Sequence, residues 1–484
     1  MAVRVRAWLI ACATLLILLV PSVIAGSAVA KWDRGPSTIA ADIPYGEFSA
    51  AAPDASSVTR QAYDLLLTNF VTPPSPSMLL GAAAVEVGTR VGDRKTDTWS
   101  APTIADNASK DEAWAAFETW LDSVAAILSP VIDRSTLDEL AIKSMAAAVS
   151  EHHTRYLDPR QNEEHQAWRR GEVRYDGIGA RLRRPSTVVL EVFDGSPAEK
   201  AGLRTGDRII EVDGQSVANE TSDVAIGRIR GPLGSIVQVT VQRKGSADAL
   251  QFLMERAEIK LPFVRSDVLQ RDNGQKIGYL QIRGFPEPSV DDKVGQVLAD
   301  VDKQGVDGLV IDLRGNSGGR IDVGMKVVSR FVREGAIFQQ VDQFGKQKLV
   351  KPTGDQYWER SVPIVALVDG GTASMGEILS SALQEAGVAR VVGTSTAGSV
   401  AGARLFPLAN GGALQITVLT ITSGRGKVLN DIGVKPDVTV DLSDDDLLRG
   451  VDAQLETAIQ SLTQAPVRVG LLPFLLRFAQ GKAA

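Results

Sequence analysis

Two glycine-rich turns, each following a run of apolar residues, hold the side chains of this sequence that are best suited to chemistry. The first turn lies in residues 311–319 (IDLRGNSGG) and the second in residues 369–378 (DGGTASMGEI). Such turns expose backbone N–H groups, and a helix that begins there adds a partial positive charge. Ser374, at the start of the helix expected after the second turn, is therefore either a nucleophile beside oxyanion donors or a simple helix N-cap.

A serine nucleophile needs a general base, and the sequence offers few groups that titrate near neutral pH. Its three histidines, His152, His153 and His165, lie within one short window. They lack the HExxH spacing of a zinc site. Because the only cysteine is Cys12, close to the N-terminus, the chain beyond it can form neither a disulfide nor a cysteine-based metal site. We therefore expect no metal and no cofactor.

Taken in order, these motifs resemble the C-terminal-processing (tail-specific) serine peptidases. The DLRxNxGG run, the GTAS run with a glutamate after it, and the SGR and IGVKPD runs in residues 423–437 occur in this family's order, over roughly residues 140–440. The resemblance implies a crotonase-like α/β core, and it implies that Ser374 attacks the scissile carbonyl. It also implies that the N–H groups of Met375 and Gly319 hold the oxyanion.

The sequence departs from this family where many members carry their general base, a lysine in a TxGK context. The matching stretch, residues 393–399, reads GTSTAGS and places Ser399 at the lysine position. A serine cannot accept the proton that a buried neutral lysine accepts, so the Ser–Lys dyad is absent. Glu385 falls at an acidic position that often accompanies the dyad. It could still orient another group, but we expect it to be a solvated helix residue.

His153 is the best candidate for the missing base. It lies in residues 151–159 (EHHTRYLDP), a stretch that resembles the DPHTxYL sequence near the start of the family's catalytic region. Tricorn-like relatives of the family lack the lysine and use a histidine, and an imidazole titrates in the range that suits a serine nucleophile. His152 and Lys427 remain alternatives, and no group that orients the histidine can be assigned.

A third set of motifs, in residues 172–258, resembles a bacterial PDZ domain. A glycine-rich loop at Gly177, Ile178 and Gly179 is followed by SPAEKAGL and GDRIIEVDG runs, in the order of that family. The resemblance implies that the N–H groups of this loop face the terminal carboxylate of a peptide that adds as a strand. Glycine suits the loop because the backbone must come close to its ligand. The alternative is that the domain serves only as a spacer or lid.

The remaining pattern indicates the elements that position these motifs. Apolar residues recur at helical spacing in residues 57–70, 114–124 and 136–150, residues 81–110 are ambiguous, and from residue 261 onward short apolar strands alternate with helices. We predict an α/β (α+β) multi-domain fold with a helical N-terminal subdomain, a PDZ-like β-rich domain and an α/β peptidase core. The predicted boundaries are 1–30 for a signal peptide or anchor, 31–105 for a linker or variable arm with a helix, 106–171 for the helical subdomain, 172–258 for the PDZ domain, 259–443 for the peptidase core and 444–484 for a C-terminal helix and tail.

The N-terminus has the pattern of an export signal. Arg4 and Arg6 precede an apolar run to about residue 25, and Ala28, Val29 and Ala30 offer a small-residue cleavage site. Because the run is nearly long enough to span a bilayer, an uncleaved anchor that associates the protein with a membrane is the alternative. Either way we expect the protein outside the cytoplasm, periplasmic or secreted. The formal net charge of −6 gives no basic field for nucleic acid.

Together these features predict an exported serine endopeptidase that cuts proteins near their C-termini. Its partners would be protein or peptide substrates with free C-termini, bound through the PDZ domain. Two alternatives stay open. A non-catalytic, PDZ-containing peptide-binding protein fits the missing lysine. An apolar-ligand binder of the retinoid-binding type fits the core, although such proteins generally lack a PDZ insertion.

Overall fold

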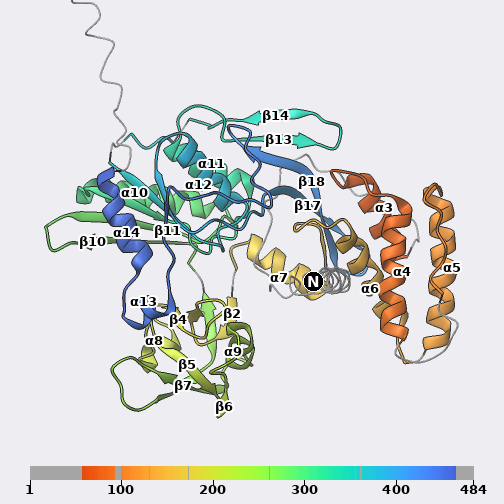
Figure 1. Ribbon diagram of the computed structural model, residues 1–484, viewed down its shortest axis with the longest axis horizontal. Helices are drawn as coiled ribbons and strands as arrows, with labels where there is room; N and C mark the ends of the chain where they lie inside the picture. The colour runs from red at the N-terminus through yellow and green to blue at the C-terminus, as the bar shows by residue number, and fades with distance from the viewer. Residues whose placement is uncertain are drawn as a thin grey trace, which may run out of the picture.

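The computed structural model describes residues 57–92, 100–129, 131–172, 174–260, 262–354, 356–359 and 362–464. The predicted leader with Cys12, the arm before residue 57 and the tail after residue 464 lie outside this part. Within it, the chain forms a helical arm, a small β-rich body and a larger α/β body (Figure 1). The predicted multi-domain α/β fold class is confirmed. No helix among these residues is both long enough and apolar enough to cross a membrane.

Four helices build the arm around one apolar core: α3 (Val58–Asn69), α4 (Pro76–Gly92), α5 (Lys110–Leu128) and α6 (Arg134–Ala148). The sequence explains where three of these helices begin. Ser109 and Asp133 are the N-caps of α5 and α6, and Pro76 is the first residue of α4. The same core takes in Leu414 and Ile416, which belong to a strand of the larger body. The arm is therefore packed onto that strand and is not a free-standing bundle.

The β-rich body has a core of its own and is entered and left at one place. The chain enters through β2 and leaves through β9, and these two strands pair antiparallel. Its elements are β2 (Arg174–Gly177), β3 (Ala180–Leu182), β4 (Val189–Val192), α8 (Pro197–Ala201), β5 (Arg208–Val212), β6 (Gln215–Ser216), α9 (Ser222–Ile229), β7 (Ile236–Gln242), β8 (Leu250–Glu255) and β9 (Ala257–Lys260).

A segment from near the C-terminus also docks on the β-rich body. Asp444, the first residue of α13 (Asp444–Leu448), pairs with Arg183 and with Arg208, each at 3.1 Å. Leu447 joins a small apolar cluster on the same surface. The β-rich body is thus held by this contact in addition to its two covalent connections.

The larger body is built on a six-stranded sheet, and its two glycine-rich turns follow the carboxyl ends of two neighbouring strands of that sheet. In order, the strands are β10 (Val264–Gln270), β11 (Lys276–Ile282), β12 (Gly308–Asp312), β15 (Ile364–Val368), β16 (Arg390–Gly393) and β19 (Val438–Thr439). All neighbours from β11 to β19 are parallel, so β12 and β15 end side by side. The helices α10 (Ser289–Gln304), α11 (Ile321–Phe331) and α12 (Met375–Glu385) cover one face, and α14 (Ala453–Ser461) covers the other.

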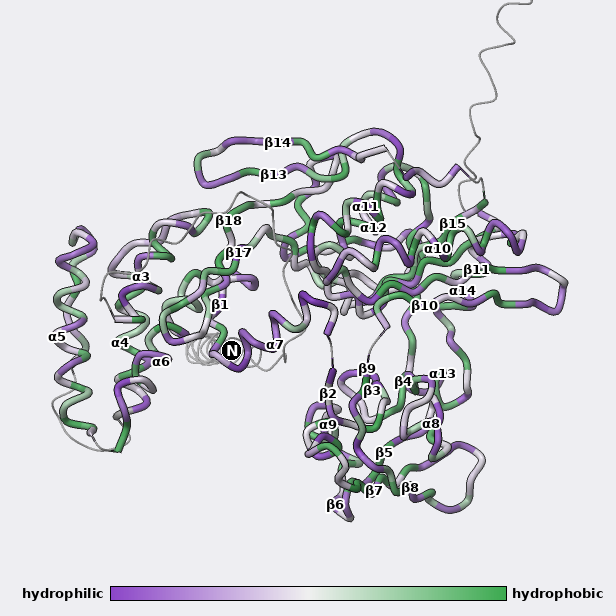
Figure 2. The backbone as a smooth tube through the Cα atoms, turned by 180° about the vertical axis from the view of Figure 1, so that it is seen from behind, coloured by the Kyte–Doolittle hydropathy of each residue, from purple (hydrophilic) through white to green (hydrophobic). Residues whose placement is uncertain are grey.

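A second sheet links the arm to the larger body. Its strands are β1 (Arg155–Leu157), β18 (Ala413–Ser423), β13 (Phe338–Asp342) and β14 (Gln347–Val350), and β17 (Ala401–Pro407) also pairs with β18. After β1 comes α7 (Pro159–Arg169), capped by Asp158, and the two elements are in contact (Figure 2). In this sheet β1, which precedes the β-rich body in the chain, pairs with β18, which comes after that body and after most of the larger body.

Candidate active site

Ser374 lies where the second glycine-rich turn meets a helix. β15 ends at Val368, the turn follows, and Ser374 immediately precedes α12. Its side chain is buried and its φ is +52°, a value that residues other than glycine rarely adopt. Strained backbone of this kind persists only where its surroundings hold it, and it is frequent at active sites.

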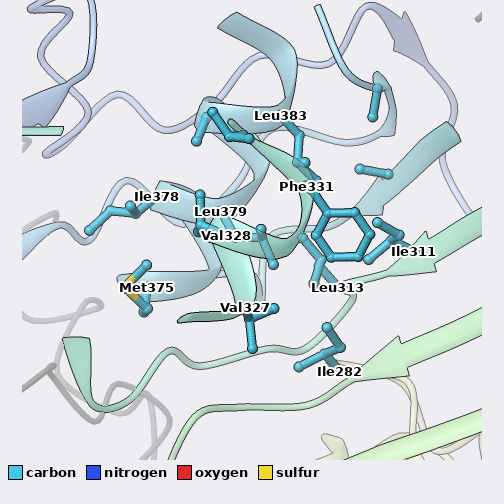
Figure 3. Packing of buried hydrophobic residues seen from close by; sticks show 14 of the residues in the cluster. Ile282, Ile311, Leu313, Val327, Val328, Phe331, Met375, Ile378, Leu379 and Leu383 are labelled. Atoms are coloured by element: carbon cyan, nitrogen blue, oxygen red, sulfur yellow. The ribbon is translucent and has the colours of Figure 1, made fainter. Parts of the chain in front are cut away.

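The helix behind Ser374 is fixed by the main apolar core. Figure 3 shows Met375, Leu379 and Leu383 of α12 close to Val328 and Phe331 of α11, and all five side chains are buried. Protein cores are close-packed, so the start of α12 cannot shift without opening gaps among these side chains. The core therefore fixes the position of the serine.

The buried carboxylate of Glu377 forms hydrogen bonds with the backbone around Ser374. It accepts hydrogen bonds from the N–H groups of Ser374 (3.0 Å), Gly398 (2.8 Å) and Ser399 (2.9 Å) and from Oγ1 of Thr396 (2.5 Å). Burial raises the pKa of Glu377, although these donors act in the opposite direction. The N–H of Ser374 also lies 2.9 Å from the carbonyl oxygen of Ser399. The segment that holds Ser399, at the family's lysine position, is thus hydrogen-bonded directly to the backbone of Ser374.

The first glycine-rich turn packs against Ser374. A Cβ atom on Gly318 would lie 2.6 Å from Cβ of Ser374 and 3.0 Å from the nitrogen of Met375. Gly319 forms a parallel bridge with Phe285, which directs the Gly319 N–H away from that residue. Among the described residues, the N–H groups of Gly319 and Met375 have no hydrogen-bond acceptor. Both predicted oxyanion donors are therefore unpaired.

We expect Gly318→Ala to remove most of the activity, whereas Gly335→Ala leaves it within a few-fold of the wild-type value. The two glycines have nearly the same φ, +92° and +93°, so each substitution carries a similar backbone strain of about 1–3 kcal/mol. Only the methyl group at position 318 meets Ser374, because Gly335 has no neighbouring atom within 4 Å. Denaturant unfolding and kcat/KM measured for both variants check this, and equal losses of activity would contradict the contact.

His153 lies fully buried just before β1, with both ring nitrogens engaged. Nδ1 is 2.8 Å from Oε1 of Glu151, and Nε2 is 3.3 Å from Oγ of Ser399. Its carbonyl oxygen accepts a hydrogen bond of 2.8 Å from the side chain of Gln415 in β18. In the described part of the chain, Nε2 makes no hydrogen bond with Ser374. The hydroxyl that meets the ring is that of Ser399.

Glu151 orients this histidine, a role that the sequence left unassigned. Its Oε2 accepts hydrogen bonds from the N–H of His153 (3.0 Å), Oγ1 of Thr154 (3.1 Å) and Oγ1 of Thr417 (2.5 Å). Burial alone would raise the pKa of Glu151, but the hydrogen bonds from His153 and Thr417 and the attraction of His153 outweigh it and lower the pKa. A carboxylate two residues before a histidine was the available signal. Only the folded turn shows that the two side chains meet.

The other residues considered for the base are engaged elsewhere. Lys427 has an exposed side chain whose Nζ lies 3.5 Å from Oε1 of Glu385. The prediction that Glu385 is solvated is wrong, because its carboxylate is buried and accepts a hydrogen bond of 2.8 Å from Oγ of Ser423. His152 has an exposed side chain and lies 3.2 Å from Oδ1 of Asp431.

The predicted carboxylate loop of the β-rich body presents free donors. The carbonyl of Ile178 accepts a hydrogen bond from Ala198 (2.8 Å), and the carbonyl of Gly179 accepts one from Phe193 (2.9 Å). The N–H groups of Ile178 and Gly179 have no acceptor among the described residues. Gly179 has a φ of +80°, and a Cβ atom there would lie 2.3 Å from Cβ of Ser196. Glycine is therefore required at this position.

A strained serine at a helix start, two unpaired N–H groups beside it and a buried glutamate–histidine pair together define a serine hydrolase type of site. Comparison with known proteins identifies the class further. The profile of Peptidase family S41 matches residues 276–440, and that of the PDZ domain matches residues 188–243.

Relatives of known name extend over most of the chain. The chain is 31% identical over 360 residues to a carboxyl-terminal-processing protease of Synechocystis sp., covering 73% of this chain and 83% of that protein. It is 29% identical over 369 residues to the carboxy-terminal processing protease CtpB of Bacillus subtilis, covering 75% of this chain and 76% of the relative. The chain belongs to peptidase family S41, among the carboxyl-terminal-processing proteases, and is a serine-type endopeptidase that acts on proteins.

Solved structures have the same fold. The photosystem II D1 C-terminal processing protease is 25% identical, with a TM-score of 0.50 over 82% of this chain and 97% of that one. A putative S41 protease from Bacteroides fragilis superposes with a TM-score of 0.53 at 16% identity, over 87% of this chain and 100% of that chain. The resemblance to the C-terminal-processing peptidases found in the sequence is confirmed.

Proposed function

We propose that this protein is an exported C-terminal processing peptidase in which Ser374 is the nucleophile and His153 the general base. In this assignment Glu151 orients the histidine, and the N–H groups of Met375 and Gly319 hold the oxyanion. One observation carries the proposal. The buried ring of His153 is hydrogen-bonded to Ser399, and the carbonyl of Ser399 in turn accepts the N–H of Ser374.

In this proposal Ser399 passes the proton between the nucleophile and the base, because Nε2 of His153 meets Ser399 and not Ser374. Oγ of Ser374 bonds to the carbonyl carbon of the substrate, and the π electron pair moves to the carbonyl oxygen. The Ser374 proton goes to Oγ of Ser399 while the Ser399 proton goes to Nε2 of His153. As the carbonyl re-forms, the C–N bond breaks, its electron pair stays on the nitrogen, and the proton held by His153 passes to that nitrogen, which releases the C-terminal fragment. Water then bonds to the acyl carbon and gives its proton to His153 by the same path, and the bond from that carbon to Oγ of Ser374 breaks as Ser374 regains a proton.

The PDZ domain, in this proposal, captures the C-terminus of the substrate. The unpaired N–H groups of Ile178 and Gly179 support it, since a terminal carboxylate is a strong acceptor for such donors. The peptide would lie along β3, whose hydrogen-bonded neighbour in the sheet is β4. A substrate held in this way is delivered to the active site with its end fixed.

We expect Gly179→Ala to weaken binding of a C-terminal peptide by at least about tenfold, since a lost hydrogen bond to a charged group is worth about 1.5–3 kcal/mol. Gly195→Ala is the matched control, because Gly195 has a φ of +72° but no atom within 4 Å of a new methyl group. Peptide affinity measured by fluorescence polarisation for the two variants checks the assignment. Equal affinities in both would show that the loop does not bind the carboxylate.

Export is supported by the charged start, the apolar run and the small residues Ala28 and Ala30. In this proposal the mature protein works in the periplasm or outside the cell, and a retained leader would hold it at the membrane. N-terminal sequencing of the protein from fractionated cells tests this. An intact Met1 on protein found in the cytosol would refute export.

A further inference from the structure

Arg155, the first residue of β1, carries a charge that the structure leaves unpaired. The residue is half-buried, and its Nε is buried with no hydrogen-bond partner. Among the described residues, no carboxylate lies within ion-pair distance of its guanidinium. Burial also lowers the pKa of Arg155, with no acidic neighbour to oppose the change. A cation that is partly removed from water without a partner is costly, so such a group indicates an anion that binds there.

The strand pairing places this guanidinium on the face of the sheet that carries the proposed base. Arg155 is directly opposite Gln415 in the antiparallel pair of β1 and β18, so their side chains share a face. The side chain of Gln415 donates to the carbonyl of His153. Tyr156, the next residue of β1, is buried in the core of the helical arm, on the opposite face. The Cα atoms of Arg155 and His153 are at most about 7 Å apart, because only one residue lies between them in the chain.

His165 is the second unsatisfied group at this place. It lies on α7, which contacts β1 (Figure 2), and its buried Nδ1 has no hydrogen-bond partner. Burial and the nearby charges of Arg155 and Arg169 lower the pKa of His165 to about 4. The ring is therefore neutral at working pH and has one nitrogen that can donate.

We propose that Arg155, with His165 beside it, is the subsite that binds the α-carboxylate of the segment being cut off. This inference rests on the proposed function, and it adds a second reader of the substrate C-terminus, next to the chemistry. The planar guanidinium accepts a carboxylate in two parallel hydrogen bonds. The PDZ loop would recruit the substrate, and Arg155 would fix how many residues separate the cut from the chain end.

The test uses two peptides of identical sequence, one with a free C-terminal acid and one with a C-terminal amide. We expect wild-type protein to cleave the acid with a kcat/KM at least about tenfold higher, the value of one charged hydrogen bond. Arg155→Met should reduce that ratio toward one. Arg160→Met should leave it unchanged, because Arg160 is an exposed residue paired with Glu164. The same ratios measured in a Gly179→Ala background remove the contribution of the PDZ loop.

Three results would overturn the subsite. The first is equal cleavage of acid and amide by wild-type protein, which leaves the peptidase assignment intact. The second is fast cleavage of an amidated peptide that ends in glutamate, which would show that any carboxylate suffices. The third is a melting temperature of Arg155→Met several degrees below that of the wild type, because loss of an unpaired, half-buried cation should not destabilise the ligand-free protein. Cleavage of neither peptide by wild-type protein would instead count against the proposed function.

Discussion

We expect the Ser374→Ala protein to lose cleavage almost completely, with kcat reduced by about 10⁶-fold, as when other serine peptidases lose their nucleophile. The fold should persist, because the contacts that hold residue 374 use its backbone N–H, which donates to Glu377 and to the carbonyl of Ser399. Mass spectrometry of an unfolded protein substrate with an apolar C-terminus reads the cleavage, and circular dichroism reads the fold.

Ser380→Ala is the matched control for the nucleophile. Ser380 is a buried serine of the same helix, and its Oγ donates to the carbonyl of Glu377 at 3.1 Å. Its loss should cost about 1 kcal/mol of stability and leave kcat within a few-fold of wild type. Cleavage by Ser374→Ala at a rate close to that of the control would refute the assignment and would direct attention to another nucleophile.

The second large effect concerns the pair that forms the proposed base. We expect Glu151→Gln to lower kcat by up to about 10⁴-fold, the loss seen when the orienting carboxylate of a catalytic triad becomes an amide. The amide has a single acceptor oxygen, whereas Glu151 accepts at both oxygens from His153, Thr154 and Thr417. One donor must therefore lose its acceptor, and the ring of His153 loses its fixed tautomer.

The pH dependence separates this role from a purely structural one. The pKa of Glu151 is lower in the folded protein than its ordinary value. The ionised carboxylate therefore stabilises the fold fully at pH values above the ordinary pKa of a glutamate. That stabilisation is lost as the pH falls through the lowered pKa, and Glu151→Gln should lack this component of the acid transition. Melting temperature and kcat/KM measured against pH check both points. An unchanged pH profile of activity in Glu151→Gln would contradict the orienting role.

Ser399→Ala distinguishes a proton relay from direct contact between the base and the nucleophile. If Ser399 passes the proton, its removal should reduce kcat with little change in KM, since general base catalysis contributes about 10²–10⁴-fold. The backbone groups of Ser399 that hold Ser374 and Glu377 remain in this variant. A kcat equal to that of the wild type would mean that His153 reaches Ser374 without it.

The position of Ser374 was accessible from the sequence because local rules determine it. Apolar runs predicted β12 and β15, and each is followed by a glycine-rich turn at the same sheet edge. The helix α4 was not predicted, because its alanine-rich sequence places apolar residues around most of its surface and shows no clear period. Local pattern therefore succeeded for short apolar runs that a glycine-rich turn ends, and it failed for a helix whose apolar residues show no clear period.

The partners of His153 and Glu385 were beyond the sequence for another reason. His153 and Ser399 are 246 residues apart, and the acceptor role of Glu385 depends on Ser423, 38 residues later. Such contacts are created by strand pairing across the whole chain, and a single sequence does not encode which side chains then meet. A buried carboxylate looks the same in sequence as a solvated one until its donors are in place.

The pairing of β1 with β18 has a consequence for the timing of activity during synthesis. The loop with Glu151 and His153 precedes the PDZ domain, but β18, which holds it through Gln415 and Thr417, is made only after Ser374. A growing chain that already contains its nucleophile therefore has no strand to seat its base. Contacts of such long sequence separation form late in folding. The enzyme would begin to cut only after β18 has been made and has paired with β1, so that a copy that lacks this strand cannot attack its neighbours or itself.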